Sequence, residues 1–228
     1  MLDSKSSDCE LDTAESENFP MTGLRTTFFL LSLLSSAAII TEENPRPNLV
    51  LILAGDLEYG DLGCLGSSDV STPHLDRLAR QGVRLTSWYA QPVCNPSRYA
   101  MLTGRHPKRT HGTLMVPLMR AEGPDEAKGH AEHETTLADL LRRQGYRTAL
   151  IGKWHLAHGR TELFPTQHGF DAFFWHTGGC VAFFTLKYGN IPDGYRGETL
   201  DGTVGYATDV VTDAAVRFLR KQQPQHPF

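Results

Sequence analysis

Apolar residues form three short runs along the chain, and each run predicts a β-strand. Residues 49–54, LVLILA, are all apolar, rich in branched side chains and too few for a helix, which is typical of a strand buried on both faces. Residues 83–90, VRLTSWYA, alternate in character and include two aromatic rings, and residues 146–152, YRTALIG, form the third run.

Between and after these runs, apolar residues recur at the spacing of amphipathic helices. Threonine and proline mark most of the starts, and glycine marks most of the ends. The predicted helices run from Pro73 to Gly82, from Pro96 to Gly104, from Thr135 or Thr136 to Gly145, and from Tyr206 to Lys221. Residues 120–133 and 173–196 lack such a period and predict irregular segments. Strands alternating with helices indicate an α/β fold, with a mixed, mostly parallel central sheet and helices on both faces.

Polar and glycine residues cluster where each predicted strand ends. The clusters are GDLEYGD at residues 55–61, CNPSR at residues 94–98 and GKWH at residues 152–155. In open α/β sheets ligands bind beyond the carboxyl ends of the strands. We therefore expect the three clusters to converge on one cleft.

The charge of the chain is unevenly distributed. The formal net charge is -4, and the first 20 residues hold six acidic side chains against a single lysine. The remainder is nearly neutral and has no block of lysine or arginine, so it offers no electrostatic footprint for a nucleic acid. Nucleic-acid binding is therefore excluded from the candidate functions.

Residues 21–40 form an apolar segment that follows one basic residue, Arg25, and ends in small residues. This pattern predicts a secretory signal, with a short membrane anchor as the second interpretation. The acidic residues 1–20 would then precede the signal, which leaves either Met1 or Met21 as the true start. A linker follows at 41–47, and the folded body starts at 48. The signal predicts export to the periplasm, the cell exterior or the lysosomal route, with no stable membrane partner.

The four cysteines, Cys9, Cys64, Cys94 and Cys180, are too few for a disulfide framework at this length. Cys9 would be lost with the signal, so at least one thiol must stay unpaired. Cys64 and Cys180 could form a bridge or remain two free buried thiols. Cys94 is the expected unpaired thiol.

The surroundings of Cys94 predict chemistry. Pro96 suits the first turn of a helix, which places Cys94 at or just before the helix N-terminus, where free N–H groups and the helix dipole favour an anion. Arg98 adds a forked cation suited to a tetrahedral oxyanion, and a cysteine in this setting is reactive. The spacing C-x3-R is too short for the C-x5-R phosphate loop of cysteine-dependent tyrosine phosphatases.

Instead CNPSR, followed by LTGRHP at residues 102–107, resembles the signature of the sulfatase family. Three further segments, at residues 46–67, 71–90 and 145–156, resemble the opening strand and metal loop, the first helix and second strand, and the third strand with its active-site lysine and histidine. Four motifs in the family's order make the resemblance specific, and it covers about residues 46–228. It implies an alkaline-phosphatase-like fold and the hydrolysis of sulfate esters of alcohols or carbohydrates.

The resemblance also implies roles for individual residues. Cys94 would be oxidised to formylglycine by a formylglycine-generating enzyme, and Arg98 would steady the hydrated aldehyde. Lys153 and His155 would bind the sulfate oxygens, and one of them would protonate the leaving alcohol. Asp56, together with the oxidised Cys94 side chain, would ligate a calcium or magnesium ion.

The sequence departs from the family at two places. Gly55 stands where the family has the first of two aspartates, so a metal site here would lose one carboxylate and bind weakly. The sequence also stops at Phe228, where sulfatases continue with a further strand, histidine and metal ligands, which predicts the N-terminal part of a larger enzyme, with a truncated sheet. Two alternatives remain open: a related phosphonate monoester or phosphodiester hydrolase, and a catalytically inactive remnant.

Overall fold

The computed structural model describes residues 46–109, 128–129, 134–158 and 161–228. The expected acidic stretch, signal segment and most of the linker lie outside the described residues, as does most of the irregular segment at 120–133. Among the helices that the structure describes, none is both long enough and apolar enough to cross a bilayer.

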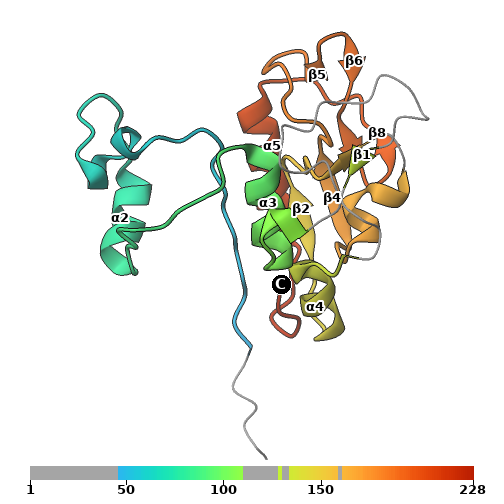
Figure 1. The fold of residues 1–228 in the computed structure, drawn as a ribbon, viewed down its shortest axis with the longest axis horizontal. Helices are drawn as coiled ribbons and strands as arrows, with labels where there is room; N and C mark the ends of the chain where they lie inside the picture. Colours follow the sequence, from blue (N-terminus) through green and yellow to red (C-terminus); the bar gives the residue numbers. More distant parts are fainter. Residues whose placement is uncertain (1–45, 110–127, 130–133, 159–160) are drawn as a thin grey trace, which may run out of the picture. The chain divides into compact units, whose positions relative to one another are not determined.

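The largest sheet among the described residues is a mixed sheet of four short strands, of which β2, β4 and β8 are labelled in Figure 1. The strands, in spatial order, are β2 (Ala149–Ile151), β4 (Ala172–Trp175), β7 (Tyr195–Arg196) and β8 (Thr199–Leu200). Strand β2 runs parallel to β4, whereas β4 with β7 and β7 with β8 are antiparallel pairs. The mixed sheet and the strand predicted at 146–152 are therefore confirmed. The sheet was predicted to be mostly parallel, whereas its described pairings are one parallel and two antiparallel.

Two small antiparallel pairs accompany this sheet. Strand β1 (Lys128–Gly129) pairs with β3 (Ala157–His158), and β5 (Lys187–Tyr188) pairs with β6 (Ile191–Pro192). Strands β4 to β8 all fall within or next to residues 173–196, which the sequence pattern marks as irregular. Each of them spans only two to four residues, so none is long enough to show a clear alternation.

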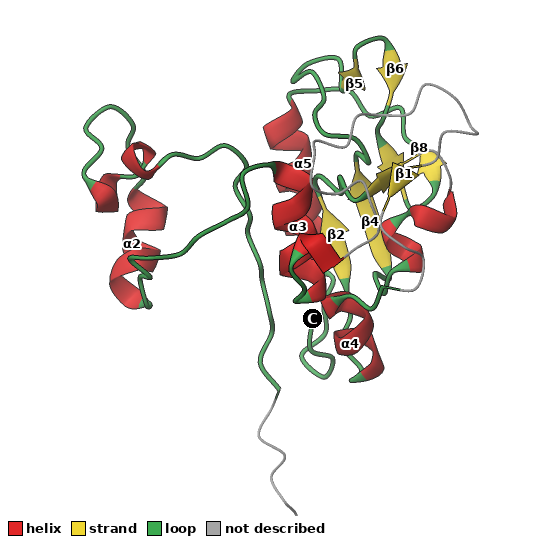
Figure 2. Ribbon diagram, in the orientation of Figure 1, coloured by secondary structure: helices red, strands yellow, loops and turns green. Residues whose placement is uncertain are grey.

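Helices cover both faces of the sheet. Neighbouring residues of a strand point to opposite faces, so successive residue pairs pack against different helices. Leu150 pairs with Phe173, and both pack with residues of α3 (Cys94–Thr103) and α4 (Leu137–Arg143). The next pair, Ile151 and Phe174, packs instead with residues of α5 (Ala207–Arg220). The predicted layering of helices on both faces is confirmed by this packing, and Figure 2 shows the helices in red and the strands in yellow.

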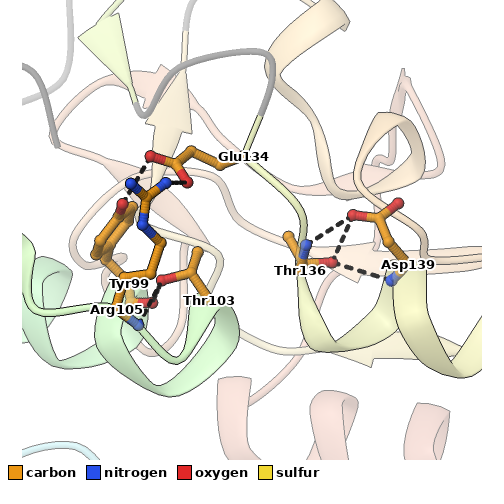
Figure 3. Close-up of polar contacts among 6 residues, drawn as sticks. All are labelled: Tyr99, Thr103, Arg105, Glu134, Thr136 and Asp139. Atoms are coloured by element: carbon orange, nitrogen blue, oxygen red, sulfur yellow. Dashed lines mark hydrogen bonds and ion pairs between the residues drawn. The ribbon is translucent and has the colours of Figure 1, made fainter. Parts of the chain in front are cut away.

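The helices begin and end close to the predicted positions. Helix α2 (Pro73–Gln81) starts after Thr72 with proline in its first turn and ends at Gly82. Helix α4 starts at Thr136 with a capping box, in which the Thr136 hydroxyl accepts from the Asp139 N–H at 3.1 Å and the Asp139 carboxylate accepts from the Thr136 N–H at 2.8 Å (Figure 3).

Short 3-10 turns complete the described chain. They are η1 (Tyr59–Asp61), η2 (Gly63–Leu65), η3 (Pro107–Arg109), η4 (Thr161–Leu163) and η5 (Pro165–Gln167). Hydrogen bonds connect η2 to α2. The Asp76 carboxylate of α2 accepts from the Cys64 N–H of η2 at 2.7 Å and from the Thr72 hydroxyl at 3.0 Å.

The strands predicted at 49–54 and 83–90 are wrong for this structure. Both segments have no regular secondary structure, and their side chains are exposed, with Ile52 at 78% and Val83 at 90% of full exposure. Within the described chain, the backbone of 49–54 makes one hydrogen bond, from the Leu49 N–H to the Phe228 carbonyl at 2.6 Å. A strand needs a ladder of such bonds and a covered face, and the described residues supply neither.

Candidate functional site

Cys94 is the first residue of α3, as the sequence predicts for the helix N-terminus. The residue before it, Val93, has extended backbone angles and gives no side-chain cap. The Ser97 hydroxyl lies 3.0 Å from the backbone N and O of Gln91 and fixes the chain that leads into the helix. Pro96 is buried and is the third residue of the helix. The helix therefore starts two residues before the start at Pro96 that the sequence predicted.

Arg98 joins this helix to the third predicted cluster. Its Nε donates to the Trp154 carbonyl oxygen at 2.8 Å, and its Nη2 donates to the carbonyl of Lys153. Burial lowers the pKa of Arg98 to about 10, and the neighbouring Cys94 acts in the opposite direction. Arg98 therefore stays cationic near neutral pH, and it brings the CNPSR and GKWH clusters together.

The GKWH segment continues the parallel pairing of β2 and β4 beyond the ends of both strands. The Trp154 N–H donates to the His176 carbonyl at 2.9 Å, and the His155 N–H donates to the Thr177 carbonyl at 3.1 Å. Trp154 is buried, and its indole N–H donates to the Leu163 carbonyl. His155 is also buried and has a left-handed φ of 52°, a conformation that non-glycine residues seldom adopt.

A buried histidine that the sequence reasoning missed lies beside this segment. His176 follows β4, and its Nδ1 lies 3.0 Å from the Gly178 carbonyl oxygen, so the neutral ring carries its proton on Nδ1 and leaves Nε2 as an acceptor. Burial lowers the pKa of His176 to about 3, opposed by the bond to Gly178 and assisted by Lys153, Arg98 and His155. The site therefore combines cationic side chains with the neutral imidazole of His176.

GKWH was identified because polar residues beyond the carboxyl end of a strand are candidates for ligand binding. The same reasoning would have identified His176 if β4 had been predicted. The sequence HTGG at residues 176–179 follows β4, but β4 falls in a segment without a clear period. A second missed residue is Asp193, which is buried and accepts hydrogen bonds from Thr177 and Gly178.

Among the described residues, no hydrogen bond joins the first cluster, at residues 55–61, to the other two clusters. Asp56 is exposed and has a left-handed φ of 57°. Asp61 accepts from the Glu58 N–H at 2.8 Å, a contact within the loop itself. The convergence of three clusters is thus observed for two of them.

The residues present do not form a site that fits a calcium ion. Within the described ranges, no three side chains of His, Cys, Asp or Glu lie close enough together to hold a metal. Position 55 has no carboxylate, and the space around Gly55 is open, with nothing within 4 Å of where a Cβ would stand. Asp56 alone falls well short of the six to eight oxygen ligands that calcium takes.

The three thiols in the described chain are free. Cys64 and Cys94 are partly buried and Cys180 is exposed, so no bridge joins Cys64 to Cys180. This observation agrees with the expectation that Cys94 is unpaired. It rules out the Cys64–Cys180 bridge, but these two free thiols are not buried as the alternative assumed.

Comparisons with known proteins agree with the motifs. The family model described as Sulfatase matches residues 47–228. Steryl-sulfatase of Mus musculus is 51% identical over 140 residues, and Arylsulfatase H of Homo sapiens is 48% identical over 138 residues. N-acetylgalactosamine-6-sulfatase of Rattus norvegicus is 41% identical over 159 residues. These matches cover 57%, 58% and 67% of this chain, but only 22%, 25% and 30% of the relatives.

A solved structure shares the fold. The crystal structure of Ps i-CgsB superposes with a TM-score of 0.70 at 29% identity, over 80% of this chain and 43% of that one. The chain thus spans under a third of the length of the curated relatives named above and under half of this structure. Because the family model matches well over half of the chain, the chain belongs to the sulfatase family.

Proposed function

We propose that this chain carries the nucleophile and part of the sulfate-binding site of a sulfuric ester hydrolase. The observation that supports this most directly is the pair of hydrogen bonds from Arg98 to the carbonyls of Lys153 and Trp154. These bonds hold the N-terminus of α3, with Cys94 at its first residue, next to the GKWH segment. A nucleophile position, a helix N-terminus and a group of cations are thereby assembled.

The arrangement suits a sulfate ester because such an ester is an anion and a poor electrophile. Oxidised to formylglycine, Cys94 would supply a hydrated aldehyde whose hydroxyl attacks sulfur. The helix N-terminus and Arg98 favour a negative charge at this position. Lys153 would neutralise the sulfate oxygens, and a lysine or histidine would give its proton to the leaving alcohol. We assign that proton to Lys153 or His155.

No step is assigned to a metal ion, because the described residues do not fit one. A catalytically inactive protein is therefore the second candidate, favoured by Gly55 and by the exposure of Asp56. A phosphonate monoester or phosphodiester hydrolase is the third, because the same cations would serve a phosphate or phosphonate group.

The names of the relatives suggest the substrate class. They refer to steryl, aryl and N-acetylgalactosamine-6 sulfates, and Ps i-CgsB has been crystallised with k-i-k-neocarrahexaose. We propose that the substrate here is a sulfate ester of a small alcohol or a carbohydrate. Because the chain covers only part of these relatives, the activity of the whole protein belongs to the same proposal. Export through the segment at 21–40 would bring the chain to a formylglycine-generating enzyme.

The test is to produce the chain with and without a formylglycine-generating enzyme and to measure the mass of the peptide that contains Cys94. Hydrolysis of 4-nitrophenyl sulfate is then compared with that of the corresponding phosphate and phosphonate esters. We expect formylglycine at position 94, a preference for the sulfate, and loss of turnover in Cys94→Ala. A faster reaction on a phosphorus ester would select the phosphonate or phosphodiester hydrolase. Unmodified Cys94 and no turnover of any ester would select the inactive protein.

A further inference from the structure

The residues after β4 form the second side of the candidate site. Residues 176–179 run alongside the GKWH segment and accept hydrogen bonds from the N–H groups of Trp154 and His155, through the carbonyls of His176 and Thr177. The backbone of His155 is thus held by residue 177. A contact that holds residues 177–179 in place therefore also holds the backbone of His155 in place.

Asp193 fixes these residues. It lies between β6 and β7, and its side chain is completely buried, at 0% exposure. One carboxylate oxygen accepts from the Thr177 hydroxyl at 2.8 Å and from the Thr177 N–H at 3.4 Å, and the other accepts from the Gly178 N–H at 2.8 Å. Removing a carboxylate from water is costly, so a buried one persists only where such donors meet it.

The two glycines of this segment allow the close contacts. A Cβ on Gly178 would lie 2.7 Å from the Asp193 carboxylate oxygen Oδ2. A Cβ on Gly179 would lie 2.9 Å from both Cε1 and Nε2 of the His155 ring. Real Cβ atoms do not come this close, so the segment is packed between the carboxylate on one side and the imidazole on the other. The position of the ring therefore depends on where the carboxylate holds the backbone.

We propose that Asp193 is a positioning residue for His155: its carboxylate holds residues 177–179, and Gly179 in turn fixes the His155 imidazole in the site. The effect on catalysis rests on the proposed sulfatase function, whereas the effect on the ring position does not. An error of about 1 Å in such a group reduces the rate by about a hundredfold.

The decisive variant is Asp193→Asn. Asparagine keeps the shape of the side chain but replaces one carboxylate oxygen with an NH2 group. Of the two groups that Asp193 binds, the Thr177 hydroxyl and the Gly178 N–H, one would then face a donor in place of an acceptor. Asp201→Asn is the matched control: Asp201 also accepts from a threonine hydroxyl and N–H, those of Thr203, but it has no described contact with residues 176–179.

The first measurement is the nuclear Overhauser effect between the Gly179 Hα and the His155 Hε1 in the full chain. We expect this signal in the wild type and in Asp201→Asn, and we expect its loss, with a shift of the His155 ring resonances, in Asp193→Asn. Unchanged signals in a folded Asp193→Asn variant would overturn the proposal. If that variant does not fold, the same spectra of Thr177→Val and Thr177→Ser are compared. Only serine keeps the hydroxyl from which Asp193 accepts, so we expect the signal to be lost in Thr177→Val alone. Equal spectra for these two variants would also overturn the proposal.

The second measurement uses the protein that carries formylglycine. We expect kcat/KM on 4-nitrophenyl sulfate to fall at least tenfold in Asp193→Asn and Thr177→Val and to stay near the wild-type value in Thr177→Ser and Asp201→Asn. An inactive wild type would refute the proposed function, while the spectra would still test the position of His155. A displaced ring with unchanged kcat/KM would refute the catalytic part of the proposal.

Discussion

At the level of single residues, Arg98 assembles the candidate site, because its guanidinium donates to the carbonyls of Lys153 and Trp154. Cys94 and Arg98 lie together because both belong to one helix turn, and GKWH lies beside them because it follows a strand of the sheet. His176 was missed because β4, the strand that it follows, shows no clear period. Asp193 was missed because its carboxylate accepts hydrogen bonds from Thr177 and Gly178, which lie 16 and 15 positions earlier in the sequence. No periodicity reports such contacts.

His176 makes the stability of the fold sensitive to acid. Its pKa falls from an ordinary 6.5 to about 3 on folding, so below pH 6.5 the unfolded chain binds the proton and the folded chain resists it. This contribution to stability is therefore complete above pH 6.5 and is lost as the pH falls toward 3, at roughly 1 kcal/mol per pH unit. We expect the free energy of unfolding, measured by urea titration, to fall over this range.

The variant His176→Asn separates this effect from the titration of other groups. The asparagine amide keeps a donor for the Gly178 carbonyl but does not titrate, so the free energy of unfolding should depend less on pH between 6.5 and 3. His74→Asn, at an exposed position of α2, should keep the wild-type dependence. Identical pH profiles for the wild type and His176→Asn would contradict the assignment.

Gly55 accounts for one missing carboxylate, and the structure has room for it. Nothing lies within 4 Å of a Cβ built at Gly55, so Gly55→Asp introduces a charged oxygen ligand next to Asp56 without a clash. Because ligand charge sets the affinity for calcium, we expect the Kd measured by calorimetry to decrease at least tenfold relative to the wild type.

Gly60→Asp is the control for Gly55→Asp. It adds the same charge in the same loop, at another position with nothing within 4 Å, and we expect it to leave the affinity nearly unchanged. Sub-micromolar binding of calcium by the wild type would show that the ligand set is complete without residue 55. Equal gains from both variants would show a general effect of negative charge.

At the level of elements, the helices were predicted well and the strands poorly, for one physical reason. A helix forms its hydrogen bonds within a single segment, so capping residues and spacing report it directly, as at Thr136 in α4 and Thr72 before α2. A strand depends on partners elsewhere in the chain. Residues 49–54 and 83–90 have strand-like sequences but no ladder among the described residues, whereas Thr199–Leu200 pairs without a recognisable pattern.

The start of α4 depends on its contact with the 168–170 turn. The Thr136 hydroxyl donates to the His168 carbonyl at 2.8 Å, and Gly169, with a φ of +83°, would place a Cβ 2.2 Å from the Asp139 backbone nitrogen. A methyl group there is strained and would push the turn away from the helix. We expect Gly169→Ala to lower the free energy of unfolding by about 2–4 kcal/mol, measured by urea denaturation.

The matched control for Gly169→Ala is Gly202→Ala. Gly202 has nothing within 4 Å of its Cβ position and no left-handed φ, so we expect a change within about 0.5 kcal/mol. A Gly169→Ala variant as stable as the control would mean that the contact between the 168–170 turn and α4 does not contribute to the free energy of unfolding. The cap at Thr136 would then be the main determinant of where α4 begins.

At the level of the whole molecule, two core clusters stabilise the sheet and its helices, while the two strand-like segments stay uncovered. The clusters contain the large aromatic residues Trp154, Phe173, Phe174 and Trp175. Outside them, Ile52 is 78% exposed and Trp88 is 77% exposed, within segments that are otherwise rich in apolar side chains. Such surfaces favour association between chains.

We therefore expect the 228-residue chain made alone to associate in a concentration-dependent way, seen as a rising weight-average mass in sedimentation equilibrium. Replacing Ile52 and Trp88 together with lysine should shift this association to at least tenfold higher concentration, because each change adds a charge to an exposed apolar segment. Val204→Lys is the control, since Val204 is 85% exposed but lies outside both segments. A wild type that stays monomeric and melts in one sharp cooperative step would show that residues 49–54 and 83–90 are covered in solution, and the strand assignment made from the sequence would then have to be reconsidered.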